Sequence, residues 1–266
     1  MKWKGIPMLC LSGVRRSLFA GACLAAAAVC ASSQVIPPST AIPVVFTQSL
    51  QAGQAKPGDA VRAKTMEVVF LPNGRILPAG STVIGHVVSS TRFLFDATPY
   101  AVQKPSVLSV HFDSIAMQGQ PIPVALVVRA VAGPVASHEA EAPHDLDEID
   151  WSGTRVLIGG ERTSPLEKTV LSADGRIAGY STRQGVFARL LAADDVNPDS
   201  DVHCAATATE QSVGIFSADA CGAYGLNGVS LTGDGRHNHA TFVLESTQRT
   251  VKLFAGSTAL LQVMAD

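Results

Sequence analysis

The feature that most constrains this sequence is a succession of short β-branched and aliphatic runs, separated by turns that contain Gly or Pro. Residues 107–115 alternate between apolar and polar side chains, which is typical of a strand with one buried face. No stretch shows sustained helical periodicity. Further extended runs cover residues 44–50, 60–70, 83–88, 122–131, 212–216, 240–244 and 250–264. We therefore predict an all-β fold, a barrel or sandwich of short antiparallel strands with a long, loop-rich central insertion.

Three glycines are predicted to hold structural turns. Gly58 follows a proline, as a type II turn favours, because Gly adopts positive φ without steric cost. Gly80 and Gly256 belong to an internal repeat, in which residues 77–88 and 253–264 align without gaps. The two copies share a Leu, the segment Ala-Gly-Ser-Thr and a later Val. The repeat indicates the same tight turn in two related strand–turn–strand units.

The first 31 residues have the layout of a secretory signal peptide. Residues 17–30 are small and apolar, and this run is shorter than the roughly 20 residues that a membrane span needs. We expect cleavage before Ser32, no transmembrane helix in the mature chain, and a periplasmic, outer-membrane or extracellular location. Twin-arginine and general export both remain open, because the basic region contains Lys2, Lys4, Arg15 and Arg16.

Charge and cysteine usage follow from that cleavage. The mature chain keeps 16 Lys and Arg against 22 Asp and Glu, and it has no basic cluster of the kind that binds nucleic acid. Cys204 and Cys221 are the two cysteines that remain. In an oxidising compartment, an isolated pair of this kind predicts a disulfide.

Composition divides the mature chain into four parts. Residues 32–43 are polar and proline-bearing and read as an exposed tether, and residues 44–135 form a first β half. Residues 136–211 are acidic and then rich in Gly and Ser, which predicts an insertion with little core and one helical segment at 186–193. Residues 212–266 return to β character and close the same domain.

A divalent ion is the one cofactor that the residues allow. His237 and His239 are two apart, so on a strand both imidazoles face one side, and Asp234 is a candidate third ligand. The acidic run at residues 138–150 offers carboxylates for calcium, but its spacing departs from an EF-hand loop. The alternative for both segments is a solvated strand or loop.

Enzyme motifs are missing from the sequence. It has no phosphate-binding loop and no G-x-S-x-G elbow, and residues 179–183 lack the last Gly of that elbow. Ser81 and Ser257 lie in turns without a His to activate them, and Glu67 and Asp113 are lone carboxylates. We therefore expect a non-enzymatic protein, with a cryptic hydrolase as an alternative.

The order of the turns resembles a known family. The Pro-Gly-Asp turn at 57–59, the Pro-Asn-Gly turn at 72–74, residues 76–85 and the closing segment 250–258 are similar to the TrbI-type conjugal-transfer family. The β-barrel of that family forms part of the envelope-spanning core of type IV secretion systems. The resemblance covers residues 44–131 and 250–266, and it implies a barrel, an envelope location and envelope proteins as partners.

This chain departs from that family at its N-terminus. Family members carry a membrane helix and a long proline-rich stretch before the barrel, where this chain has a signal peptide and a short tether. We expect an exported, non-enzymatic envelope barrel. The alternative is a periplasmic or secreted module that binds a ligand, glycan or metal.

Overall fold

The computed structural model describes residues 36–71, 74–96, 102–117, 119–142, 153–164, 166–183, 185–192, 204–233 and 241–264. These residues belong to one unit, Val35–Asp266. The fold is all-β, as the sequence predicts. The predicted signal peptide, and the tether as far as residue 35, lie outside the described residues.

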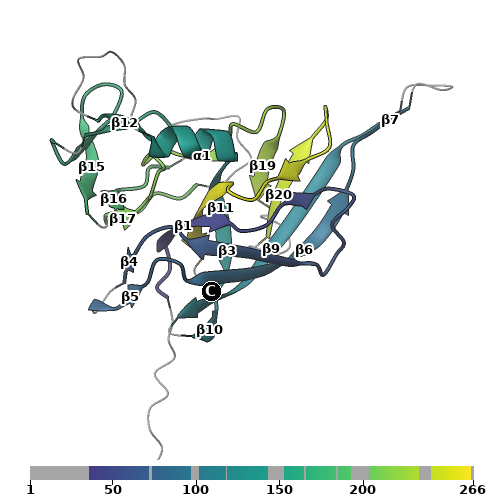
Figure 1. The fold of residues 1–266 in the computed structure, drawn as a ribbon, viewed down its shortest axis with the longest axis horizontal. Coiled ribbons are helices and arrows are strands. Elements are labelled where there is room, and N and C mark those ends of the chain that lie inside the picture. Colours follow the sequence, from purple (N-terminus) through teal and green to yellow (C-terminus); the bar gives the residue numbers. More distant parts are fainter. Residues whose placement is uncertain are drawn as a thin grey trace, which may run out of the picture. The chain divides into compact units, whose positions relative to one another are not determined.

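A ten-stranded sheet, here called the large sheet, contains most of the long strands (Figure 1). Only β11 and β18 pair in parallel, and the other pairs are antiparallel. The end strands β18 and β19 lie close together, so the sheet nearly closes into a barrel. The spatial order is β18 (Gly222–Tyr224), β11 (Leu126–Ala132), β22 (Thr258–Val263), β1 (Ala41–Phe46), β3 (Ala60–Thr65), β6 (Thr82–Thr91), β9 (Ser106–Met117), β20 (Thr241–Ser246) and β19 (Ser230–Gly233), with β10 (Gln120–Pro123) beside β9.

Alternating side chains of these strands fill the barrel. Along β3, exposed and buried residues alternate without exception, which is the period-two pattern of a strand with one solvated face. Three rings stack in the interior: Phe112 lies 6.3 Å from Phe46 and 5.7 Å from Phe242, measured between ring centroids. The burial of these apolar faces is the main stabilising contribution to the large sheet.

The internal repeat forms the same turn twice. Gly80 and Gly256 have φ values of +77° and +84°, and Gly58 has +89°. The Gly80 N–H donates to the Thr65 carbonyl (2.8 Å) at the end of β3, and the Gly256 N–H donates to the Phe46 carbonyl (2.9 Å) at the end of β1. Each repeat copy therefore ties its turn to the end of a neighbouring strand of the barrel.

The predicted tether is wrong from residue 36 onward. Ile36, Ala41 and Ile42 are buried, and β1 begins at Ala41 rather than at Val44. Pro43 was the signal for an exposed segment, but its carbonyl still accepts a hydrogen bond from Met66 N–H (2.9 Å) within the fold. A proline fits a strand wherever its missing N–H is not needed.

The insertion forms a second sheet, which the sequence did not indicate. Its six strands pair antiparallel in chain order over a second cluster of buried apolar side chains, which also includes Ala41, Ala130 and Leu260 of the large sheet. The predicted helix at 186–193 is wrong, because Val186 and Ala188 point inward from a strand. The strands of this second sheet are β12 (Arg155–Val156), β13 (Arg162–Thr163), β14 (Thr169–Leu171), β15 (Ile177–Thr182), β16 (Gly185–Ala188) and β17 (Gln211–Ser212).

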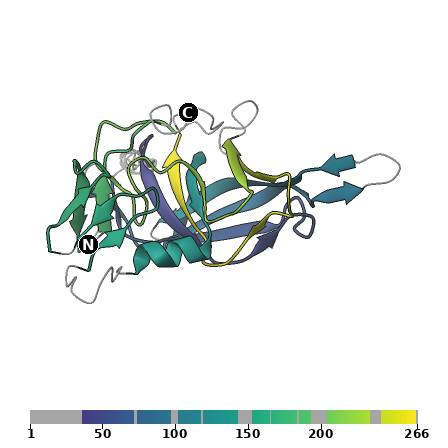
Figure 2. The ribbon, with the colours of Figure 1, turned by 90° about the horizontal axis from the view of Figure 1, so that it is seen from above.

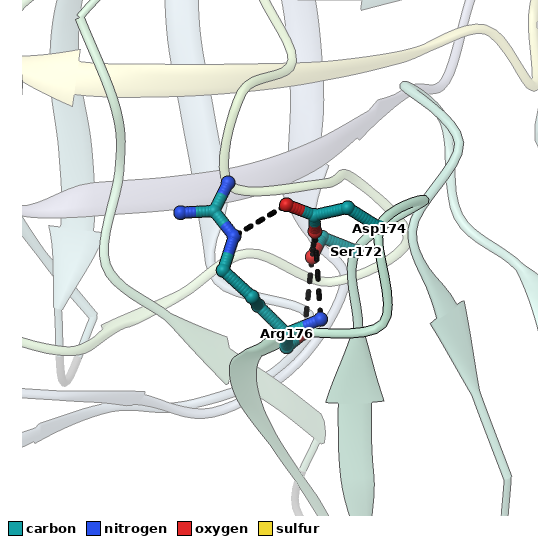
Figure 3. Close-up of polar contacts among 3 residues, drawn as sticks. All are labelled: Ser172, Asp174 and Arg176. Atoms are coloured by element: carbon teal, nitrogen blue, oxygen red, sulfur yellow. Dashed lines mark hydrogen bonds and ion pairs between the residues drawn. The ribbon is translucent and has the colours of Figure 1, made fainter.

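A short polar network closes the hairpin between β14 and β15 (Figure 3). The Asp174 carboxylate accepts hydrogen bonds from Ser172 Oγ and Arg176 Nε, each at 2.5 Å. These two hydrogen bonds hold the pKa of Asp174 below its usual value. The network is exposed, so we expect it to shape the turn and to add little to stability.

One helix, α1 (Pro134–Glu141), joins the two sheets along the chain. Pro134 occupies its first turn, where the missing N–H costs nothing. No helix in the described part of the chain is long and apolar enough to cross a membrane.

Three two-stranded sheets complete the fold. The pair β7–β8 forms a hairpin that extends outward from the ends of β6 and β9 (Figure 2). The pairs are β2 (Leu50–Gln51) with β21 (Lys252–Leu253), β4 (Val69–Phe70) with β5 (Ile76–Leu77), and β7 (Leu94–Asp96) with β8 (Val102–Lys104).

Candidate functional site

The predicted disulfide is present, and it lies beside a fully buried arginine. Cys204 and Cys221 are joined, and Cys204 Sγ lies 3.4 Å from the carbonyl oxygen of Arg129. Arg129 is the extra residue of a β-bulge in β11, where the register with β22 shifts. Its guanidinium donates to four backbone carbonyls, those of Leu191, Ala205, Ala218 and Ala220. Burial lowers the pKa of Arg129 to about 10, so it stays charged at neutral pH.

Glu161 continues this network into the second sheet. Its carboxylate accepts a hydrogen bond from Ala218 N–H (3.0 Å), and its own N–H donates to Ser217 Oγ (3.0 Å). Burial raises the pKa of Glu161 and that of Asp219. Together with Arg129, these contacts fix the segment that carries Cys221, which gives the network a structural role.

Glu67, one of the two lone carboxylates, lies between the large sheet and the second sheet. It accepts a hydrogen bond from Ser212 Oγ (2.8 Å) and another from the backbone of Gly214. Gly185 leaves space for it, since a Cβ there would lie 1.3 Å from Glu67 Oε2. Burial raises the pKa of Glu67 to about 7, with the Ser212 hydrogen bond acting against the shift.

Asp113, the other lone carboxylate, has histidine partners on the large sheet. Its carboxylate lies 2.9 Å from His86 Nδ1 and 3.8 Å from His111 Nε2. Asp113 is the extra residue of a bulge opposite Gly85, where a Cβ would lie 2.2 Å from a backbone oxygen. Asp113 is a lone carboxylate in the sequence prediction, which missed this cluster, although the His-x-Asp spacing at residues 111–113 could have indicated it.

This cluster does not form a hydrolase site. Thr241 Oγ1 lies 3.3 Å from His111 Nδ1, in the order of a nucleophile, a base and a carboxylate. Thr241 is only 5% exposed, and the 3.8 Å between His111 and Asp113 is too long for a hydrogen bond. Ser81, one of the turn serines considered as a nucleophile, is engaged in its own turn, because its Oγ donates a hydrogen bond to the Pro78 carbonyl.

The predicted metal ligands Asp234, His237 and His239 lie outside the described residues, so that site stays a prediction. Among the residues that the structure does describe, no group of three or more His, Cys, Asp or Glu side chains is arranged to hold a metal ion. The acidic run is described only as far as residue 142, where it forms the end of α1 and the residue after it.

A cavity of about 770 Å³ lies on the second sheet next to α1. Three cationic side chains line it: Arg155 at β12, Lys168 just before β14, and Arg183 in the turn between β15 and β16. Lys168 has a positive φ of 53°, an uncommon conformation for a residue with a side chain. Its carbonyl accepts a hydrogen bond from Ser181 N–H (3.1 Å), which holds two lining residues together.

Thr163 gives this cavity a second unusual feature. The residue is only 6% exposed and lines the cavity, and its hydroxyl has no hydrogen-bond partner among the described residues. A buried hydroxyl without a partner costs about 1–3 kcal/mol. The cavity therefore combines unpaired positive charge with an unused hydrogen-bonding group. Sequence reasoning missed it, because its lining comes from segments that share no motif.

Comparison with protein-family models, with curated proteins and with solved structures found no match to this chain. The fold defines a class nonetheless: a disulfide-bonded all-β protein in which a nearly closed barrel carries an appended sheet.

Proposed function

We propose that this chain is an exported, non-enzymatic protein of the cell envelope whose barrel assembles with other envelope proteins. The signal-peptide pattern of residues 1–31 and the turn motifs similar to those of the TrbI-type family support this proposal. In that family, the barrel is a building block of the type IV secretion core. The observation that carries the assembly role is the β7–β8 hairpin.

The β7–β8 hairpin exposes apolar side chains to solvent instead of burying them in the core. Every residue of the two strands is exposed, and Leu94, Phe95 and Val102 are 38%, 58% and 47% exposed. A two-stranded hairpin is at best marginally stable alone in water. The register places Leu94 and Val102 on one face of the hairpin and Phe95 on the other. Exposed apolar side chains on both faces of a projecting hairpin favour a contact with another protein.

The base of the hairpin is held while its strands stay exposed. Phe93 N–H donates to Thr250 Oγ1 (3.3 Å), and the Gln103 amide donates to the Thr247 carbonyl. The anchored base limits the ordering cost when a partner adds a strand or packs on Phe95.

The test is the size of the complex in solubilised envelopes of producing cells. We expect the wild-type chain to migrate in a native gel well above 27.7 kDa, the mass of the unprocessed chain, and the Phe95→Asp variant to migrate as a monomer. Leu166→Asp is the matched control, because Leu166 is 74% exposed on the second sheet and should change nothing. A monomeric wild-type chain, or an unprocessed one, would refute the proposal.

A further inference from the structure

We propose that the cavity on the second sheet binds a small organic anion, a carboxylate or phosphate ester attached to an apolar group. This site is separate from the β7–β8 hairpin and adds a ligand to the assembly role.

The charge of the cavity is the first argument. The chain has a formal net charge of −2, yet Arg155, Lys168 and Arg183 converge on one cavity from three separate elements. None of the three forms an ion pair with a residue that the structure describes. The mutual repulsion of three cations is relieved by a bound anion, and the guanidinium fork matches both carboxylate and phosphate oxygens.

The Thr163 hydroxyl is the second, independent argument. Thr163 lines the cavity and is 94% buried, and its hydroxyl oxygen is shielded from solvent and lacks a partner in the described part of the chain. A hydroxyl can donate to an anionic oxygen, so a rotation of the Thr163 side chain into the cavity would let an anion held by the three cations satisfy this group. A buried polar atom without a partner in a native fold indicates something that completes it.

Size and lining decide the class of anion. The cavity of about 770 Å³ is within the range of small-molecule sites and far larger than an inorganic ion needs. Leu157, Val186 and Ile215 contribute apolar lining beside the polar groups. An organic anion uses both parts of the lining, because its acidic group meets the cations while its apolar group contacts the aliphatic side chains.

The test titrates the full chain with benzoate and with phenyl phosphate by calorimetry, and with benzyl alcohol as a neutral analogue. We expect saturable one-to-one binding of the two anions with a dissociation constant below about 1 mM, weaker binding at high salt, and no binding of the alcohol. Arg155→Gln should weaken anion binding about tenfold. Arg162→Gln is the matched control, since Arg162 is exposed on the same sheet and does not line the cavity.

Thr163→Val separates ligand binding from a merely structural role. Removing an unsatisfied hydroxyl while keeping the shape should raise the melting temperature of the free protein. The same change should weaken benzoate binding severalfold, because the anion loses a donor. The proposal is overturned if neither anion binds, if benzyl alcohol binds as well as benzoate, or if Arg162→Gln weakens binding as much as Arg155→Gln.

Discussion

In the large sheet, β6 and β9 run for 10 and 12 residues, whereas the strands of the second sheet have two to six. The barrel interior is filled by aliphatic and aromatic side chains, while much of the second core is alanine. The barrel contributes Ala41, Ala130, Ala132 and Leu260 to that second core. Buried polar groups, chiefly Arg129, Glu161 and Glu67, add to the contact at the junction. One sheet is therefore stabilised by its own large apolar core, and the other by a small core shared with the barrel and by polar contacts at the junction.

Arg129→Met should produce the largest effect. Methionine keeps an unbranched apolar stem but lacks the guanidinium, so it leaves four backbone carbonyls without their donor. We expect the free energy of unfolding to fall by about 3–5 kcal/mol, measured by urea denaturation. Arg162→Met, at an exposed position, should leave it unchanged. A loss below about 1 kcal/mol at Arg129 would mean that the junction does not depend on these hydrogen bonds.

Removal of the disulfide should rank second. Cys204 and Cys221 are 17 residues apart, and a loop of this size corresponds to about 3 kcal/mol on the chain-entropy model. We expect a Cys204→Ala/Cys221→Ala variant to unfold at lower urea than the wild type. Adding a reductant should bring the wild type to the same midpoint and leave the variant where it is. A variant that responds to the reductant would argue against this assignment.

Glu67→Gln should have a smaller, pH-dependent effect. The pKa of Glu67 is raised from 4.5 to about 7 in the folded state, so the folded chain binds more protons than the unfolded chain between these values. Stability from this group is therefore present at low pH and is lost as pH rises through about 7. We expect the variant to exceed the wild type by about 1–2 kcal/mol at about pH 8 and to match it near pH 4.

The control for that pH dependence is Glu210→Gln, at an exposed carboxylate two residues before Ser212. Its unfolding free energy should follow the wild type at every pH. If the free energy of unfolding of Glu67→Gln differed from that of the wild type by the same amount at every pH, the junction would not hold a protonated carboxyl.

Asp174→Asn should have the smallest effect. The hairpin network with Ser172 and Arg176 is exposed, so solvent screens it. Because the pKa of Asp174 is lowered in the folded state, its contribution to stability is present at pH values above the unfolded-state pKa. That contribution is lost as the pH falls. We expect no resolvable shift of the melting temperature at neutral pH. A clear shift would mean that a hairpin turn, and not only the junction, stabilises the second sheet.

The sequence predicts the large sheet well because its evidence is local. The alternation along residues 107–115 predicted β9, and the repeated Ala-Gly-Ser-Thr segment predicted two equivalent turns. The second sheet could not be found in this way, because strands of two to six residues among Gly and Ser show no period. Its pairing is established by contacts between distant residues.

The candidate sites follow the same division. The cysteine pair was readable, since Cys204 and Cys221 are the two cysteines that follow the predicted signal peptide. Arg129 left one overlooked signal, a single cation inside the apolar strand Leu126–Ala132. The cavity left no signal in the sequence, because Arg155, Lys168 and Arg183 come together only after the second sheet has formed.

Hydrogen exchange of the Arg129→Met variant tests the central claim most directly, because it reports each sheet separately. If polar contacts hold the second sheet in place, amides of β13 to β16 should lose protection in the variant. Amides of β6, β9 and β20 should keep the protection that they have in the wild type. Equal loss of protection in both sheets, or none in either, would contradict the claim that the two sheets are stabilised by different means.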